Sequence, residues 1–384
     1  MTHSTTATLF AVAAFVEGSQ KNLRLSIVLP TFNEFSNVAP MAEAFLSLRS
    51  ALQFEILFVD DDSADGTADE VRRLAHQNPE VRLIRRVGRP GLSSAIKEGI
   101  LSATGDFVAV LDCDGQHEPQ AVVRALYTLL VSGADLVIGS RFHQDAQILG
   151  LSESRQRGST VANRLARLTL PAYRQLTDYM SGFFVLRLDS VMRDVRGVDV
   201  NGFKFLYELL AVSRGRLKTL EIPLNFKPRQ SGDSKLDFAV VWDFGVSVLH
   251  TFAFRIIPRR MISFALVGAS GVLVQLSISH LLRALILFPF AESVFPAAFV
   301  AATSNYLINN ALTFRAQRQR GNALLKGLIR FQLVASLPIL ANVGIATIFY
   351  DRVVPNPFWA QLAGIVVVFI WNYAASSRFV WNTP

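Results

Sequence analysis

The chain has 384 residues, which is enough for two or three domains, and a formal net charge of +8 at pH 7. Such a basic balance is typical of proteins that bind nucleic acid, a phosphorylated substrate or an anionic membrane surface. A single cysteine, Cys113, excludes an intramolecular disulfide and fits a reducing compartment for the soluble part.

The N-terminal residues, 1–22, contain one short apolar run, Leu9–Val16, without a basic flank before it. The run is too short to span a membrane and lacks the charge asymmetry of a secretory signal. We therefore expect residues 1–22 to form a flexible tail or a surface helix ahead of a soluble domain over residues 23–236.

Within residues 23–236, buried strands alternate with helical patterns of about a dozen residues. This alternation predicts an α/β domain with a mostly parallel sheet. The expected strands are Leu25–Pro30, Phe54–Val59, Val81–Arg86, Asp106–Leu111 and Asp135–Gly139.

The fourth expected strand ends in two carboxylates one residue apart, Asp112 and Asp114. If the extended geometry continues, the two side chains point the same way, because alternate residues of a strand share a face. Two hard oxygen donors suit Mg²⁺ or Mn²⁺ that also carries phosphate oxygens. The alternative interpretation is an Asp-rich turn that caps the next helix.

Other charged residues also follow the expected strands, and ligands of open α/β sheets bind at the carboxyl ends of the strands. The sequence has no G-x-G-x-x-G after the first strand and no Walker lysine loop, which argues against an ordinary dinucleotide or P-loop site. Carboxylates at the strand ends can accept hydrogen bonds from the ribose hydroxyls and base N–H groups of a nucleotide. A metal and arginines would then bind its phosphates. The charged residues at the strand ends are Glu34, Asp60, Asp61, Asp62, Asp112, Asp114 and Arg141.

A series of short motifs between residues 25 and 240 resembles family-2 glycosyltransferases of the GT-A fold, and among them the dolichol-phosphate mannose synthases. The sequence departs from the usual family pattern at Phe32, Cys113 and Gly115, where Tyr, Ala and Leu are usual, and none of these changes removes a metal donor. The motifs are P-T-F-N-E, V-D-D-D-S-A-D-G-T, G-L-S-S-A, D-C-D-G-Q-H-E-P, G-S-R, D-Y-M-S-G-F-F, G-F-K and R-Q-S-G-D-S-K-L.

The resemblance implies a Rossmann-like nucleotide-diphospho-sugar transferase domain with a donor site and a metal site. The metal, Mg²⁺ or Mn²⁺, would be bound by Asp112, Asp114 and Gln116. A polar segment with Arg229 and Lys235 would close over the donor as a lid; the alternative is a solvated basic linker. The donor nucleotide would be held by Pro30, Phe32, Glu34, Val59, Asp61, Asp112, Cys113, Arg229 and Lys235.

The acceptor implied by the resemblance is a polyprenyl (dolichyl-type) phosphate, which Arg141, Arg155 and Ser159 would bind. Arg155 and Ser159 are four residues apart, so a helix places them on one face, and arginine forks match phosphate oxygens.

An anionic acceptor needs no strong general base, so positioning and stabilisation of the leaving diphosphate would carry an inverting single displacement. The catalytic set would be Asp112, Asp114, Arg141 and Asp178. For Asp178, orienting Arg155 or capping a turn is an equal alternative.

After the soluble domain, residues 237–258 are apolar but carry Asp243, His250 and Arg255, which predicts an amphipathic helix in the plane of the membrane. Residues 259–384 predict an all-α transmembrane bundle of four helices. The expected spans are 261–282, 290–312, 331–350 and 358–377.

The membrane part contains an internal repeat: Phe264-Ala-Leu-Val resembles Phe331-Gln-Leu-Val, and Asn305-Tyr306 resembles Asn372-Tyr373. The spacing is the same, 331 − 264 and 372 − 305 both being 67, which predicts a duplicated helix pair. This half resembles the small GtrA-like membrane proteins. Basic residues before the first span, in the middle loop and after the last span predict a multi-pass inner-membrane protein with a cytoplasmic catalytic domain and C-terminus.

We therefore expect a hexosyltransferase that moves mannose from GDP-mannose to a polyprenyl phosphate at the lipid bilayer, with no nucleic acid partner. UDP-glucose is the alternative donor. A processive polysaccharide synthase is disfavoured because no Q-x-x-R-W motif occurs. An alternative of another class is a non-catalytic lipid-carrier flippase or scaffold whose soluble domain only senses nucleotide sugar.

Overall fold

The structure is a computed structural model that describes residues 23–50, 52–146, 153–200, 204–225, 238–285, 290–352, 367 and 369–381. The chain divides into two compact units, Met1–Val248 and Leu249–Pro384. The predicted tail over residues 1–22 and the predicted lid residues Arg229 and Lys235 lie outside the described residues.

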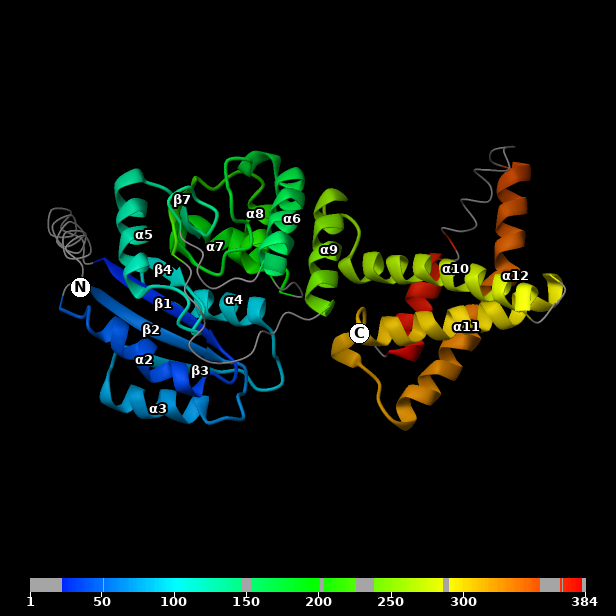
Figure 1. The fold of residues 1–384 in the computed structure, drawn as a ribbon, viewed down its shortest axis with the longest axis horizontal. Helices are drawn as coiled ribbons and strands as arrows, with labels where there is room; N and C mark the ends of the chain where they lie inside the picture. The colour runs from blue at the N-terminus through cyan, green and yellow to red at the C-terminus, as the bar shows by residue number, and fades with distance from the viewer. Residues whose placement is uncertain are drawn as a thin grey trace. The chain divides into compact units, whose positions relative to one another are not determined.

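The first unit is built on a sheet that has seven strands within the described residues, in the order β3-β2-β1-β4-β6-β5-β7 (Figure 1). All neighbouring strands run parallel except β6, which is antiparallel to both β4 and β5. The strands are β1 (Arg24–Thr31), β2 (Gln53–Asp60), β3 (Val81–Arg85), β4 (Phe107–Val110), β5 (Leu136–Ser140), β6 (Phe184–Arg187) and β7 (Thr219–Pro223).

Helices cover both faces of this sheet, because alternate strand residues point to opposite faces. In β1, Ile27 and Leu29 belong to the core under one helical layer, whereas Val28 belongs to the core under the other. Figure 1 shows the sheet between the two layers. One layer has α2 (Phe35–Leu46), α3 (Thr67–Gln77) and α5 (Pro119–Ser132); the other has α4 (Leu92–Ser102), α6 (Glu153–Thr169), α7 (Leu188–Gly197) and α8 (Phe205–Ser213).

The five predicted strands are confirmed, with every end within one residue of its prediction, but β6 and β7 were not predicted. β6 has only four residues. A short apolar run of this kind occurs equally in a buried strand, loop or helix, so the sequence pattern does not show that it is a strand. Its insertion separates β4 from β5, which are therefore not neighbours. This antiparallel strand brings residues 181–183 to the edge of the sheet where β4 ends.

The second unit is helical, and its predicted spans fall on helices as far as the structure describes them. Helix α12 begins nine residues before the predicted start of the third span at 331, whereas half of the fourth predicted span, 358–366 and 368, lies outside the described residues. The helices are α10 (Arg259–Leu285), α11 (Phe290–Ala311) and α12 (Asn322–Arg352), with a π-helical turn at Ser376–Val380; α9 (Phe238–Phe252) contains the boundary between the units.

An aromatic cluster joins the two repeats of this unit. Phe264 lies 5.6 Å from Tyr373, and its repeat equivalent Phe331 lies 5.7 Å from Tyr306, measured between ring centroids. Thus each phenylalanine contacts the tyrosine of the other repeat. Reciprocal contacts of this kind are produced by a two-fold relation between two similar halves.

Two further rings follow the same rule. Phe314 and Trp381 also stand 67 residues apart, since 381 − 314 = 67. They stack on each other at 4.1 Å with an angle of 8° between the planes. Phe264 meets Phe314 edge-on at 6.4 Å, and Phe331 meets Trp381 edge-on at 5.8 Å. The ring contacts therefore support the predicted duplication.

Among the described residues, one helix, α10, is long and apolar enough by itself to cross a membrane. Its 27 residues would extend about 40 Å at 1.5 Å per residue, which exceeds the hydrocarbon thickness of a bilayer.

Candidate active site

A cavity of about 980 Å³ lies at the carboxyl edge of the sheet in the first unit. The residues that follow β1, β2, β4 and β5 line it, together with the segment that enters the antiparallel strand β6. The predicted site residues on its wall are Pro30, Phe32, Glu34, Asp61, Asp112, Cys113, Asp114, Gln116, Arg141 and Ser159. Side chains that are far apart in the sequence are thus brought into one cavity.

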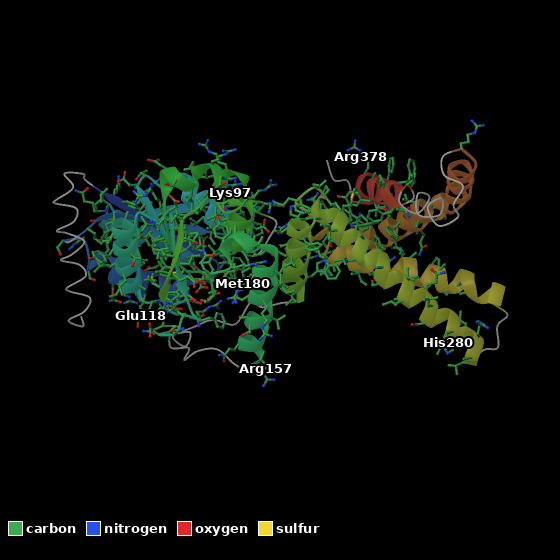
Figure 2. The ribbon with its side chains drawn as sticks, turned by 90° about the horizontal axis from the view of Figure 1, so that it is seen from above. Lys97, Glu118, Arg157, Met180, His280 and Arg378 are labelled. Carbon is green, nitrogen blue, oxygen red and sulfur yellow. The ribbon has the colours of Figure 1, made fainter. Side chains whose placement is uncertain are left out.

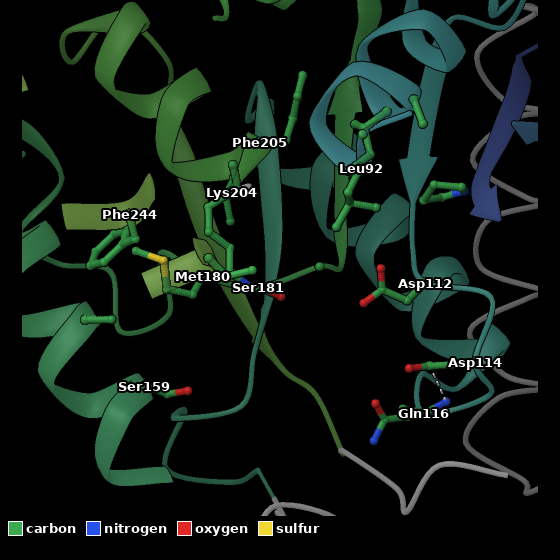
Figure 3. A pocket seen from close by; sticks show the side chains of 18 of the residues that line it. Leu92, Asp112, Asp114, Gln116, Ser159, Met180, Ser181, Lys204, Phe205 and Phe244 are labelled. Atoms are coloured by element: carbon green, nitrogen blue, oxygen red, sulfur yellow. Dashed lines mark hydrogen bonds between the residues drawn. The ribbon is translucent and has the colours of Figure 1, made fainter. Parts of the chain in front are cut away.

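The segment after β4 supplies an oxygen-rich wall. Figure 3 shows Asp112, Asp114 and Gln116 along one side of the cavity. The turn is tight: Gly115 adopts a left-handed φ of 74°, and the Gln116 N–H donates to Asp114 Oδ1 over 3.1 Å. Gly115 therefore suits this turn better than the leucine usual in the family, since glycine has no steric penalty at positive φ.

The alternative interpretation of this segment, a cap for the following helix, is wrong. The N-cap of α5 is Glu118, no side chain caps that helix, and Pro119 occupies its first turn. Asp112 instead packs against the chain entering β6. A Cβ atom added to Gly182 would lie 2.6 Å from Asp112 Oδ2, so glycine at this position leaves the space that the carboxylate occupies.

These donors fit a divalent cation by their chemistry. Two carboxylates and an amide oxygen on one wall are hard ligands of the kind that Mg²⁺ and Mn²⁺ prefer. In the described part of the chain, no three His, Cys, Asp or Glu side chains form a metal-binding cluster, so the fit rests on this mixed set of donors.

Two side chains within this segment are buried groups that carry no charge. Burial raises the pKa of the Cys113 thiol well above its usual value, and the neighbouring carboxylates act in the same direction, so the thiol stays protonated. His117 meets the ring of Phe183 edge-on at 5.8 Å. Burial lowers the pKa of His117, although the adjacent Asp112 and Asp114 act against this shift. Cys113 is therefore a protonated, buried side chain in the wall of the cavity.

Arg141 follows β5 and is held by Asp178. The Arg141 Nε donates to Asp178 Oδ2 over 2.7 Å, and Nη2 donates to Asp178 Oδ1 over 3.0 Å. The Met180 N–H also donates to this carboxylate, over 3.2 Å. Although burial raises the pKa of Asp178, the charge and hydrogen bonds of Arg141 outweigh it and hold the pKa below its usual range. Asp178 is therefore an ionised partner of Arg141.

Asp178 and Val59 are not among the described residues that line the cavity. Asp178 is fully buried and forms an ion pair with Arg141, so this contact positions Arg141. The side chain of Arg155, its predicted alternative partner, lies outside the described part of the structure. Val59 was predicted to bind the nucleoside, but its side chain is fully buried in the core beneath α4. In a buried parallel strand both faces are apolar, so its position at the strand end did not reveal which face met the site.

The predicted nucleoside-binding end of the cavity includes an exposed ring and a paired carboxylate. Phe32 is 43% exposed and lines the cavity, and an aromatic ring of this kind can stack on a nucleobase. Asp61 Oδ2 accepts the Gly91 N–H over 2.6 Å, while Oδ1 accepts Nη1 of the buried Arg86. Glu34 accepts the Asn37 side-chain N–H over 2.7 Å. The carboxylate of Asp61 is thus fixed in orientation before any ligand binds.

Helix α6 bears the predicted acceptor residues. Ser159 lies on the cavity wall (Figure 3), whereas the side chain of Arg155 is outside the described part of the structure. Figure 2 shows Arg157, on the same helix, projecting from the surface of the unit while Met180 lies inside it. Beyond Ser159 the wall becomes apolar, through Val161, Ala162, Leu165, Phe205, Leu206, Val240, Val241 and Phe244.

Two residues that the sequence did not single out also belong to the site, Gly182 and Lys204. Both occur in the motifs S-G-F-F and G-F-K that carry the family resemblance, so the motifs could have pointed to them. Their contribution depends on contacts between segments, such as that of Gly182 with Asp112, which spacing along the chain does not reveal.

Comparison with known proteins agrees with this geometry. Residues 26–195 match the family described as Glycosyl transferase family 2, and residues 263–381 match the GtrA/DPMS transmembrane domain. A dolichol-phosphate mannosyltransferase from Pyrococcus furiosus is 31% identical over 363 residues, which cover 94% of this chain and 100% of that protein. The chain belongs to the dolichol-phosphate mannosyltransferase family. It is accordingly a family-2 glycosyltransferase with a membrane domain of the GtrA type.

Other relatives share parts of the chain. An undecaprenyl-phosphate mannosyltransferase from Micrococcus luteus is 30% identical and covers 59% of this chain and 93% of its own. The crystal structure of glucosyl-3-phosphoglycerate synthase from Mycobacterium tuberculosis has 20% sequence identity and a TM-score of 0.49, covering 65% of this chain and 85% of that one.

Proposed function

We propose that the protein transfers a mannosyl residue from GDP-mannose to a polyprenyl phosphate, giving polyprenyl-phosphate mannose and GDP. The observation that carries this proposal is the cavity itself, which is polar and charged beside Asp112, Asp114 and Arg141 and apolar beyond Ser159. A nucleotide sugar fits the first part, and a phosphate with an apolar tail fits both parts. Relatives named for dolichol and for undecaprenyl phosphate support a polyprenyl acceptor.

The chain's own residues would perform the reaction mainly by positioning. Phe32, Glu34 and Asp61 would hold the nucleoside, while Arg141 and Ser159, with Arg155, would hold the acceptor phosphate. An acceptor oxygen, already ionised, would form a bond to the anomeric carbon as the bond from that carbon to the GDP oxygen breaks, with inversion. No proton has to be removed from the acceptor, so positioning and charge stabilisation carry the rate.

A divalent cation, Mg²⁺ or Mn²⁺, would be held by Asp112, Asp114 and Gln116. When bound, it would supply positive charge to the diphosphate of the leaving group. The mixed oxygen donors on one wall of the cavity support this assignment.

The proposal is tested with the purified full-length protein, a short polyprenyl phosphate and a panel of GDP-mannose and UDP-glucose, with and without chelator. We expect mannosyl transfer from GDP-mannose that stops on chelation and returns with Mg²⁺ or Mn²⁺. Preferential use of UDP-glucose would replace the proposed donor. Binding of either donor without turnover would support the scaffold alternative and refute the enzyme.

We also propose a multi-pass protein of the inner membrane whose catalytic domain and C-terminus are cytoplasmic, with α9 lying at the membrane surface. Basic residues between α11 and the first turns of α12, from Arg315 to Arg330, support this orientation. The single cysteine, Cys113, is buried. A cysteine introduced at Arg320 or at Arg283 would therefore be the one that a thiol reagent labels, and its labelling shows on which side of the membrane that residue lies. Labelling of Arg320→Cys by an impermeant reagent added to intact cells would refute the orientation.

A further inference from the structure

Lys204 lies on the cavity wall. The reaction proposed above gives it no role. It is the N-cap residue of α8, and Figure 3 shows its side chain entering the cavity beside Ser181. The helix that carries it is firmly anchored: the ring of Phe205 stacks on Phe184 at 5.9 Å, and the Tyr207 hydroxyl lies 2.9 Å from Thr169 Oγ1. The position of Lys204 is therefore set by the fold.

The charges that act on Lys204 are those of the reaction site. Burial lowers the pKa of Lys204, and Arg141 lowers it further, whereas Asp112 and Asp178 raise it. The two positive charges of Lys204 and Arg141 are thus balanced by the two negative charges of Asp112 and Asp178. If Asp112 binds a divalent cation, as in the proposed function, one carboxylate, Asp178, is left to balance Arg141 and Lys204. Two cations brought together in a poorly solvated site favour an anion between them.

The neighbours of Lys204 indicate which anion this is. The next two residues, Phe205 and Leu206, belong to the apolar part of the cavity wall, together with Phe244 of α9. Lys204 therefore stands where the charged part of the cavity changes to the apolar part. A molecule with a phosphate head and an apolar tail would place its phosphate at this point. The diphosphate of the donor would instead lie toward Asp112 and Asp114.

We propose that Lys204 binds the phosphate of the polyprenyl acceptor together with Arg141 and holds it at the junction between the charged and apolar walls. This inference rests on the proposed function, because it assumes a lipid phosphate as acceptor. Lys204 supplies a second positive charge, since the charge of Arg141 is already shared with Asp178 through two hydrogen bonds. It acts on the acceptor and leaves nucleotide binding to the opposite wall.

The test compares Lys204→Met and Lys204→Arg with the wild type in the full-length protein. We expect Lys204→Met to raise the acceptor KM by about 10- to 100-fold, the range for loss of a hydrogen bond to a charged group. The Kd for GDP with Mg²⁺, measured by calorimetry, should stay within about twofold of wild type. Lys204→Arg should restore most of the acceptor affinity, because it keeps the charge.

Lys218→Met is the matched control, since Lys218 is exposed and its Nζ bonds a backbone carbonyl outside the cavity. It should leave both constants unchanged. An equal weakening of GDP binding by Lys204→Met would assign Lys204 to the donor and overturn the inference, and so would an unchanged acceptor KM. Lys204→Arg covers the case in which the methionine variant does not fold, since it should then remain active. If the wild type itself transfers nothing to polyprenyl phosphate, the proposed function fails first.

Discussion

In the first unit, buried charged side chains form ion pairs at the carboxyl edge of the sheet, whereas in the second unit neutral polar side chains join the two repeats. Asp178 binds Arg141, and Asp61 binds Arg86, in the first unit. In the second unit the Trp381 Nε1–H donates to Asn310 Oδ1 over 3.2 Å. The two units thus use buried polarity for different purposes.

The neutral contacts form a clamp between the end of α11 and the C-terminal segment. The Gln319 N–H donates to Asn310 Oδ1 over 2.8 Å, and Gln319 Nε2 donates to the carbonyl of Val380. The hydroxyl of Tyr306 lies 2.8 Å from Gln319 Oε1. Neutral hydrogen bonds join segments without the cost of an ionised group near a membrane. Changes to the acidic wall of the cavity should therefore affect catalysis more than stability, and changes in this clamp should affect stability more than catalysis.

The largest expected effect is on catalysis. Asp114→Asn should lower the rate of transfer by about a thousandfold, equal to about 4 kcal/mol, because it weakens charge stabilisation at the leaving diphosphate. Thermal unfolding should change little. The measurement is initial rates at saturating donor, with Asp189→Asn on the exposed side of α7 as control. A rate within tenfold of wild type would contradict the assigned role of this wall.

Substitutions in the buried ion pair of Arg141 and Asp178 should affect both catalysis and stability. Arg141→Gln and Asp178→Asn should each destabilise the first unit by about 3–4 kcal/mol, because each leaves one buried charge without its partner. The double variant should lose clearly less than the sum. The exposed pair Arg72 and Asp69, with side chains 45% and 81% exposed, gives the control cycle and should show almost no coupling. Additive losses at Arg141 and Asp178 would contradict a coupled pair.

A change in the aromatic cluster should act on stability alone. Trp381→Ala should destabilise the second unit by about 3 kcal/mol, since it removes a ring stacked on Phe314 and a bond to Asn310. The turnover of folded protein at low temperature should be unchanged. Trp371→Ala is the matched control because Trp371 is 54% exposed. Equal shifts of the unfolding temperature for both variants would count against the clamp.

The smallest expected effect concerns a buried carboxylate away from the cavity edge. Burial raises the pKa of Glu55, but hydrogen bonds from Ser26, Thr104 and Arg82 outweigh it and place the pKa below its usual value. A lowered native pKa stabilises the fold above the unfolded pKa, and this stability is lost as the pH falls through the native pKa.

Glu55→Gln should therefore cost about 1–2 kcal/mol at pH 7, and the difference from wild type should shrink below about pH 4. Denaturation followed by circular dichroism between pH 7 and pH 3 measures it. A difference that stays constant over this range would show that the charge of Glu55 contributes nothing.

The sequence alone was sufficient for the features that depend on local pattern. Apolar runs of strand length predicted the first five strands, because both faces of these strands are buried and need apolar residues. Placing Asp112, Asp114 and Arg141 at one edge followed from the rule that parallel strands present their carboxyl ends together. The 67-residue repeat was visible because a duplicated helix pair retains its spacing.

Tertiary structure decided the partners of these residues. The antiparallel strand β6 could not be read from four apolar residues, yet it places Gly182 against Asp112. The same connection brings Asp178 to Arg141, and the start of α8 brings Lys204 into the cavity. Such contacts join segments dozens of residues apart, and their energy depends on distance in space. Periodicity along a chain shows which face of an element is buried, but the packing of elements determines which side chains meet.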